Sequence, residues 1–300
     1  MPRHVVEAAE AMLDLRVPVH NKGGVALIEY MGSDRAIEEA ARVSFIGSED
    51  EVRLPAQTRG LIRYLMGNRH TTPLEMVELK FWVKAPMFVW RQWIRHRTAS
   101  VNEISGRYVQ LPDEWYLPEP QFINLQSDSN KQGRSEALVS TPDDHVRSFN
   151  AEAHGAYGAY ENRLEAGMAK ELARSNLPLS MYTEAIWKID LHNLFHFLNL
   201  RLHPHAQWEI RAYAEVMRSI VKALVPVAWE AFEDFVLNAI HFSALEQMAL
   251  REILKKGVVP ADLGVFIDNF NAEELGDRMT GRERTGFAKK LEVLIGVETD

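Results

Sequence analysis

The densest group of chemically active side chains lies in one short segment, Arg95-His96-Arg97-Thr98-Ala99-Ser100-Val101-Asn102-Glu103-Ile104-Ser105-Gly106-Arg107-Tyr108. Each of its guanidinium groups can bind a phosphate or a carboxylate through two parallel hydrogen bonds. The glycine after Ser105 lets a hydroxyl and a backbone N–H approach the same oxyanion. The segment also follows a predicted amphipathic helix, whose C-terminal dipole would attract cations without any ligand. The density of Arg, His and Ser favours a pocket for a phosphorylated ligand over that structural alternative.

The same segment resembles a known family. Arg95-His96-Arg97, followed after seven residues by Ser105, is similar to the signature of the flavin-dependent thymidylate synthases, and the similarity continues through Asn102-Glu103 and Arg107-Tyr108. Other blocks agree in the family's order: Ala41-Arg42-Val43-Ser44-Phe45, His70-Thr71-Thr72-Pro73-Leu74-Glu75, Ala85-Pro86, Arg91-Gln92-Trp93, Asn199-Leu200-Arg201 and His205-Ala206-Gln207-Trp208-Glu209-Ile210. They cover roughly residues 25–235.

The resemblance implies an activity and an assembly. The expected reaction is the reductive methylation of dUMP to dTMP, with 5,10-methylenetetrahydrofolate as carbon donor, NADPH as reductant and FAD as cofactor. The expected fold is of the thymidylate synthase-complementing type, and the chain is expected to form a homotetramer whose active sites are shared between chains. No nucleic-acid or membrane partner is expected.

The resemblance also implies which residues bind dUMP. The matching positions are Gln92, Trp93, Ile94, Arg95, Glu103, Ile104, Ser105, Gly106, Arg107, Arg174 and Arg201. Gln92 and Arg95 are three residues apart on one predicted helix face, so both can reach one ligand. No His–acid pair with clear spacing would activate Ser105 as a nucleophile, so phosphate binding is its preferred role. Arg174 either binds phosphate, in a site shared with the neighbouring chain, or caps the long helix before it.

The matching positions for FAD are Ser44, His70, Thr72, Arg95, His96, Arg97, Glu103, Asp190, Leu191, His192 and His196. His192 and His196 are four residues apart, a spacing that can also bind zinc, but the acidic partner of an HExxH motif is missing and no metal is expected. The chain contains no GxGxxG, so FAD is not expected on a Rossmann fingerprint.

The absence of cysteine bears on the mechanism. The classical thymidylate synthases add a Cys thiolate to C6 of the uracil, and this chain cannot do so. By the resemblance, Arg201 is the catalytic residue that stabilises the developing uracil anion, a role that suits a permanently charged guanidinium. The alternative for Arg201 is a structural salt bridge.

The elements that must position these residues follow from hydrophobic periodicity. Alternating residues predict a half-buried strand over Met76–Lys84, and further strands are predicted over Val25–Met31 and Tyr182–Ile189. Helices are predicted over Asp34–Val43, Thr58–Gly67, Met87–Ile94, Leu191–Leu200 with Asp190 as its cap, His205–Leu224, Val227–Ala239 and Leu245–Lys255. The irregular alternation predicts an α+β fold with a mixed or antiparallel sheet flanked by helices.

The expected domain organisation is one enzyme domain over residues 1–256 and a C-terminal extension over 257–300. A polar insertion is expected at about residues 124–145. Its central part, Ser127–Asp144, has few large apolar residues and is expected to be poorly ordered.

Composition limits the other classes of function. The net charge is −8, from 34 Lys plus Arg against 42 Asp plus Glu, whereas a dedicated nucleic-acid binder is more often basic. A single-stranded nucleic-acid module built on Arg95, Arg97, Arg107, Trp93 and Tyr108 is therefore the second hypothesis. A metallohydrolase using His192, His196, His203 and His205 is the third, weakened by the lack of paired carboxylates. No apolar run reaches the roughly 18 residues of a membrane helix, and we expect a cytoplasmic protein.

Overall fold

The computed structural model describes residues 4–44, 55–128, 131–258, 262–275 and 277–295. The chain divides into two compact units, Met1–Leu237 and Asn238–Asp300. The boundary therefore lies earlier than the expected one after residue 256. The reason is that the helix α10 (Ala244–Lys256) packs its apolar side with α11 (Leu263–Glu273) and α12 (Gly281–Ile295) in one hydrophobic cluster.

The first unit is built on a five-stranded antiparallel sheet with the order β1-β2-β3-β7-β4. The strands are β1 (Val17–Val19), β2 (Gly23–Met31), β3 (Glu78–Pro86), β4 (Ser100–Glu103) and β7 (Tyr182–Asp190). The sheet and its flanking helices confirm the predicted α+β class, with the antiparallel form of the sheet.

The central strand β3 shows why one face of the sheet forms the core. Leu79, Phe81 and Val83 are fully buried, whereas the residues between them are partly exposed, as the alternating pattern predicted. The strand begins two residues later than predicted, because Leu74–Met76 forms a 3-10 turn, η1. The buried face therefore carries the contacts with the helices.

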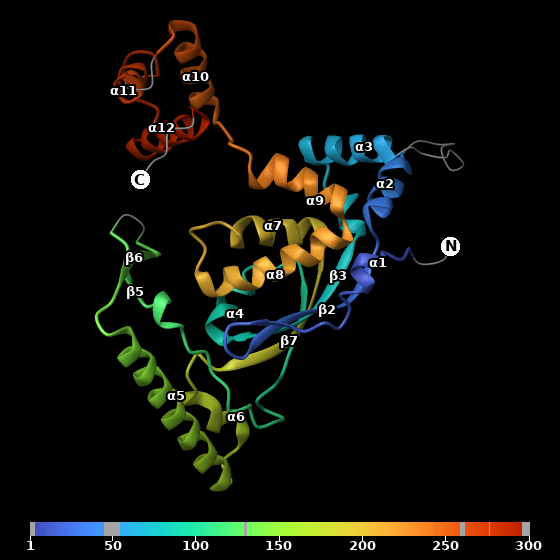
Figure 1. The fold of residues 1–300 in the computed structure, drawn as a ribbon, viewed down its shortest axis with the longest axis vertical. Coiled ribbons are helices and arrows are strands. Elements are labelled where there is room, and N and C mark those ends of the chain that lie inside the picture. The colour runs from blue at the N-terminus through green and yellow to red at the C-terminus, as the bar shows by residue number, and fades with distance from the viewer. Residues whose placement is uncertain (1–3, 45–54, 129–130, 259–261, 276, 296–300) are drawn as a thin grey trace. The chain divides into compact units, whose positions relative to one another are not determined.

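Among the helices that contribute to the core are α4 (Met87–Trp93), α7 (Leu191–Arg201), α8 (Trp208–Leu224) and α9 (Pro226–Phe232). Figure 1 shows α7 and α8 side by side over the sheet. Trp93 lies at the centre of an aromatic group, with ring centroids 5.3 Å from Trp187 and 4.9 Å from Phe197. This packing fixes the C-terminal end of α4 against the C-terminal half of α7.

Short elements complete the first unit around this core. They are α1 (Glu7–Glu10), α2 (Asp34–Arg42), α3 (Pro55–Gly67), and a π-helical turn at Glu233–Leu237 after α9. The half-buried Asp34 carboxylate accepts hydrogen bonds from the backbone N–H groups of Val227 and Ala228, at 2.9 and 2.8 Å. This carboxylate satisfies the free donors at the start of α9 and joins that helix to α2.

The described part of the polar insertion includes regular structure, whereas residues 129–130, within the segment expected to be poorly ordered, lie outside the described residues. It contains the hairpin strands β5 (Asn124–Gln126) and β6 (Arg134–Leu138), followed by the helix α5 (Pro142–Glu165) and the short helix α6 (Lys170–Ala173). Arg134 joins the hairpin to α8 through an ion pair with Glu209. The hairpin is thus held by a contact distant in sequence, which local composition does not reveal.

In the second unit, Ser243 and Glu246 form a capping box at the start of α10. Lys290 of α12 donates hydrogen bonds to the same Glu246 carboxylate, at 2.7 and 2.8 Å. In neither unit is any described helix both long and apolar enough to span a membrane.

Candidate active site

Arg201 lies at the C-terminal end of α7, in contact with the end of α4. Its Nε donates a hydrogen bond to Nε2 of His96 at 3.1 Å, and its Nη2 donates to the backbone carbonyl of Gln92 at 3.4 Å. The start of α7 is fixed as predicted, because the Asp190 carboxylate accepts from the backbone N–H of Asn193 at 2.9 Å. Gln92, His96 and Arg201, which belong to separate blocks of the sequence, are therefore brought together by the Arg201 side chain.

The Arg201 guanidinium is held by neutral groups. Burial lowers the pKa of Arg201, yet a guanidinium remains charged at all relevant pH values. Among the described residues it forms no ion pair with a carboxylate, which argues against a structural salt bridge as its role. Its charge is therefore not neutralised within the described chain.

His96 accepts the Arg201 hydrogen bond, which requires an unprotonated Nε2. Burial, followed by the nearby charges of Arg201 and His196, lowers the pKa of His96 to about 4. The hydrogen-bond network therefore assigns the neutral tautomer with its proton on Nδ1. His196, one turn from the end of α7, places its ring centroid 5.7 Å from that of His96.

A second group of candidate residues surrounds the turn after β4. The hydroxyl oxygen of Ser105 accepts from the backbone N–H of Arg107 at 3.3 Å. A Cβ at Gly106 would lie 3.0 Å from Cδ of Arg174 and 3.1 Å from Leu111, so a side chain there would require these neighbours to shift. Arg174 thus lies against the candidate phosphate turn of its own chain.

The remaining members of this second group are more exposed. Arg107 forms an ion pair with Glu171 at 3.2 Å, and both side chains are more than half exposed. Glu103, at the end of β4, accepts a hydrogen bond from the Thr183 hydroxyl at 2.7 Å. The prediction missed β4 itself, because its four residues are all exposed and polar or small except Val101. Pairing with β7 makes them a strand.

Within the described residues, no hydrogen bond or ion pair joins the two groups. We call them the Arg201 group (Gln92, Arg95, His96 and Arg201) and the phosphate group (Glu103 to Arg107 with Arg174).

Two of the predicted ligand contacts are restricted by burial. The side chains of Trp93 and Leu191 are 0% exposed, so they cannot touch a ligand and only their backbone is available.

The candidate FAD residues lie on elements packed around α7. His70 and Thr72 are exposed and precede η1, which packs against α7, and α2, which Ser44 follows, packs against η1. His192 lies one turn before His196 on α7. The Asp190 carboxylate is engaged through both oxygens by Asn193, so the structure gives it the role of a helix cap.

The donor set suits a flavin dinucleotide. Arg95 and Arg97 are exposed and make no ion pair within the described chain, and the neutral His96 lies between them in sequence. Unpaired guanidinium groups are strong partners for a pyrophosphate, and imidazole rings can stack on or hydrogen-bond to an adenine. The residues present therefore fit FAD.

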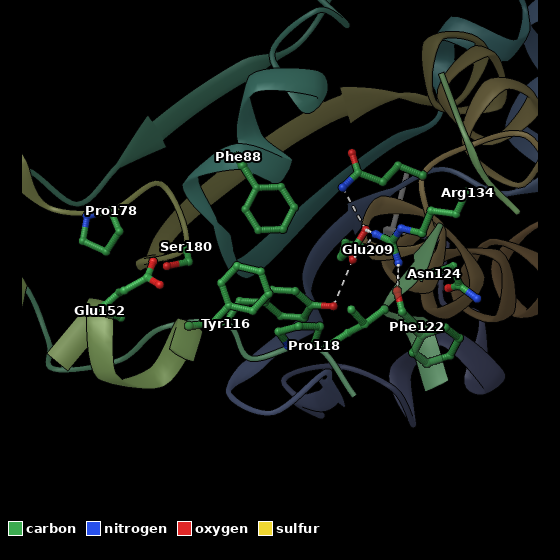
Figure 2. Close-up of a pocket in the computed structure, with 14 residues that line it drawn as sticks. Phe88, Tyr116, Pro118, Phe122, Asn124, Arg134, Glu152, Pro178, Ser180 and Glu209 are labelled. Carbon is green, nitrogen blue, oxygen red and sulfur yellow. Dashed lines mark hydrogen bonds and ion pairs between the residues drawn. The ribbon is translucent and has the colours of Figure 1, made fainter. Parts of the chain in front are cut away.

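A further network was missed by the sequence reasoning. It joins Gln207, Glu209, Arg134 and Tyr116 at one side of a cavity of about 470 Å³, whose lining also includes Phe88 (Figure 2). Gln207 also accepts a hydrogen bond from Nε2 of Gln92. Gln207 and Glu209 belong to the block that begins at His205, but the sequence analysis assigns them no role. The only signal in the sequence is the position of two polar residues at the start of a predicted helix.

Comparisons with known proteins agree on one family. The sequence profile described as thymidylate synthase complementing protein matches residues 26–227. The chain is 53% identical over 240 residues to a flavin-dependent thymidylate synthase of Thermus thermophilus, covering 80% of this chain and 86% of that protein. It is 48% identical over 289 residues to a flavin-dependent thymidylate synthase of Treponema pallidum, covering 96% and 88%. The latter match necessarily includes most of residues 238–300.

The chain is also similar in fold and sequence to a solved structure. The UMP/dUMP methylase PolB from Streptomyces cacaoi, bound with 5-Br dUMP, superposes with a TM-score of 0.68 at 35% sequence identity. The superposition covers 74% of this chain and 99% of that one.

Proposed function

This chain belongs to the thymidylate synthase complementing protein family, and on that premise we propose that it is a flavin-dependent thymidylate synthase. It converts dUMP to dTMP with 5,10-methylenetetrahydrofolate as carbon donor and NADPH as reductant. When bound, FAD supplies the hydride chemistry. The observation that carries the mechanism is a half-buried Arg201 without a carboxylate partner in the described chain, in a sequence without cysteine.

Arg201 is the proposed catalytic residue. Without a thiolate to add at C6, C5 of the uracil becomes nucleophilic only if negative charge is stabilised on the pyrimidine ring. A guanidinium held by His96 and the Gln92 carbonyl is positioned before the substrate arrives, so little reorganisation is needed as that charge develops. The neutral state of His96 is part of this arrangement, because a protonated imidazole could not accept from Arg201.

The phosphate group is the proposed site of the dUMP phosphate. Ser105 offers a hydroxyl, Gly106 permits close backbone approach, and Arg107 and Arg174 offer guanidinium groups at the same turn. For FAD, the proposed contacts are Arg95, His96, Arg97 and His196, with Ser44, His70, Thr72, Glu103 and His192 at the edge of the site.

We also propose the homotetramer with shared active sites. It accords with the finding that, among the described residues, no hydrogen bond or ion pair joins the Arg201 group to the phosphate group, so the two groups of one site can come from different chains. The edge strand β4 is exposed, and exposed edges are normally covered. Large apolar side chains in and after this strand are also exposed, among them Val101 at 51% and Tyr108 at 76%.

The two alternative functions lose support from the structure. The nucleic-acid hypothesis used Trp93 as a stacking platform, and that side chain is fully buried. Within the described part of the chain, no three His, Asp or Glu side chains are grouped closely enough to hold a metal ion. A cytoplasmic location stays a prediction.

The test combines a spectrum with an assay. The purified protein should be yellow, with a flavin absorption band, and should form dTMP from dUMP only when methylenetetrahydrofolate and NADPH are present. The gene should also allow a thymidine auxotroph to grow without thymidine. A colourless protein that forms no dTMP after FAD is added would refute the proposed function.

A further inference from the structure

Gln207 occupies the N-cap position of α8, but its side chain does not cap the helix. Its Oε1 instead accepts a hydrogen bond from Nε2 of Gln92, and its own Nε2 donates to Oε2 of Glu209 at 2.8 Å. One amide therefore connects the Arg201 group to a carboxylate at the start of α8.

Glu209 is fixed by partners from elsewhere in the chain. The side chain is 2% exposed, and Nη2 of Arg134 donates to its two oxygens at 2.5 and 2.7 Å. The Tyr116 hydroxyl donates to Oε1 at 3.0 Å (Figure 2). Burial acts to raise the pKa of Glu209, but the hydrogen bond and charge of Arg134 outweigh it, so the pKa lies below its usual range. The group is an ionised carboxylate, which can only accept hydrogen bonds.

The ionised Glu209 carboxylate sets the orientation of the Gln207 and Gln92 side-chain amides. Because Glu209 only accepts, Gln207 must turn its NH2 toward Glu209 and its carbonyl oxygen toward Gln92. Gln92 must then turn its own NH2 toward Gln207, which leaves its Oε1 as a free acceptor. No described residue donates to that oxygen.

We propose that Gln207 is a positioning residue that, oriented by Glu209, holds the Gln92 amide with its oxygen available to a hydrogen-bond donor of dUMP. The inference rests on the proposed function and deepens it. It extends the dUMP site from α4 to the start of α8 and, through Arg134, to the β5–β6 hairpin.

The chemistry of the nucleotide explains why such an orientation matters. The cations Arg95, Arg107 and Arg201 can only donate, which suits the phosphate and the carbonyl oxygens of dUMP. The nucleotide also has donors, the ribose hydroxyl and the N3–H, which need acceptors. An unrestrained glutamine amide can rotate and present its NH2 to such a donor, and facing donors leave both groups unsatisfied.

The primary test is Gln207→Met, which keeps the side-chain length and removes both hydrogen bonds. We expect the Kd of dUMP, measured by calorimetry on the flavin-loaded enzyme, to rise about tenfold, the effect of losing one oriented hydrogen bond. The kcat at saturating dUMP should stay within about twofold of wild type, because the lost contact weakens the binding of the ground state and of the transition state equally. Bound flavin should be unchanged.

Tyr116→Phe is the matched control. It also removes one hydrogen bond from Glu209, but Arg134 still holds the carboxylate, so Gln207 keeps its orientation. Its Kd for dUMP should stay at the wild-type value. Equal weakening by Gln207→Met and Tyr116→Phe, or joint loss of flavin and kcat in Gln207→Met, would show a merely structural role and overturn the proposal.

A double-mutant cycle gives an independent measurement. In the wild-type background, Gln92→Glu places a carboxylate opposite the Gln207 oxygen, so two acceptors face each other. In the Gln207→Met background that conflict is absent, and the loss of dUMP affinity caused by Gln92→Glu should be smaller. Equal losses in both backgrounds would overturn the positioning role. If the wild-type enzyme forms no dTMP, the proposed function fails; if it does and Gln207→Met binds dUMP normally, only this inference fails.

Discussion

Arg201 and Arg107 are both candidate ligands of one nucleotide, but the chain holds them in opposite ways. Arg201 is partly buried and is positioned by two neutral acceptors, His96 and the Gln92 carbonyl. Arg107 is exposed and pairs with an equally exposed carboxylate, Glu171. The first guanidinium is fixed in place with its charge unneutralised, whereas the second can exchange a weak partner for a phosphate.

This difference suggests a division of labour. A cation that must stabilise charge developing during the reaction benefits from a rigid and partly dehydrated position. A cation that captures a phosphate from solution benefits from exposure, because an exposed ion pair is weak and easily replaced. Four measurements test the contrast, beginning with the largest effect.

Arg201→Ala should keep the fold, FAD and much of the dUMP affinity, but lose most turnover. One preorganised donor is worth about 3–4 kcal/mol, or a factor of roughly 10²–10³ in kcat. Arg201→Lys should rescue poorly, because an ammonium lacks the planar fork of the guanidinium. The assay follows tritium release from C5-labelled dUMP together with dTMP formation. Near-normal activity of Arg201→Ala would return this residue to a structural role.

Ser105→Ala and Arg107→Ala should weaken dUMP binding more than flavin retention. A lost hydrogen bond to a charged group costs about 1.5–3 kcal/mol. Calorimetric titration with dUMP, beside the flavin absorbance of the same sample, measures the two effects separately. Parallel loss of both ligands would indicate collapse of the turn around Gly106 instead.

Acid should destabilise the wild type through His96. The pKa of His96 is about 4 in the folded protein against 6.5 as its ordinary value, so the unfolded chain takes up the proton first as the pH falls. This contribution to stability is complete above about pH 6.5 and is lost as the pH falls to about 4. His96→Gln keeps an acceptor but does not titrate, so its unfolding free energy should fall less steeply over that window. Urea unfolding at several pH values makes the comparison, and identical slopes would contradict it.

Glu171→Gln should have the smallest effect. The exposed pair with Arg107 is worth about 1 kcal/mol or less, so urea unfolding should show little change. The affinity for dUMP should stay the same or increase, because Arg107 loses a competing anion. A large loss of either stability or affinity would show that the pair holds Arg107 in place, which would remove its contrast with Arg201.

The sequence was informative where structure depends on local pattern. The alternation around Phe81 predicted β3, and Asp190 is predicted as the cap of α7, which its hydrogen bond from Asn193 confirms. The motif blocks also named the residues that meet at Arg201. In each case the signal lies within one element or one short motif.

The sequence did not predict those parts of the structure that depend on contacts between residues far apart in the chain. β4 has a polar, exposed sequence, and only pairing with β7 makes it a strand. The hairpin of the insertion is joined to α8 by Arg134 and Glu209, which are 75 residues apart. Local periodicity does not reveal such a pair, so neither the contact of the hairpin with α8 nor the orientation of Gln207 could be predicted from the sequence.

The proposed division of each active site between the Arg201 group of one chain and the phosphate group of another has a genetic consequence. A chain damaged at Arg201 still carries an intact phosphate group, and a chain damaged at Arg107 still carries an intact Arg201 group. When two such alleles are expressed in one cell, some mixed oligomers would pair the two intact halves and recover activity. Neither allele would be fully recessive or fully dominant, and the gene would show complementation between its own mutants.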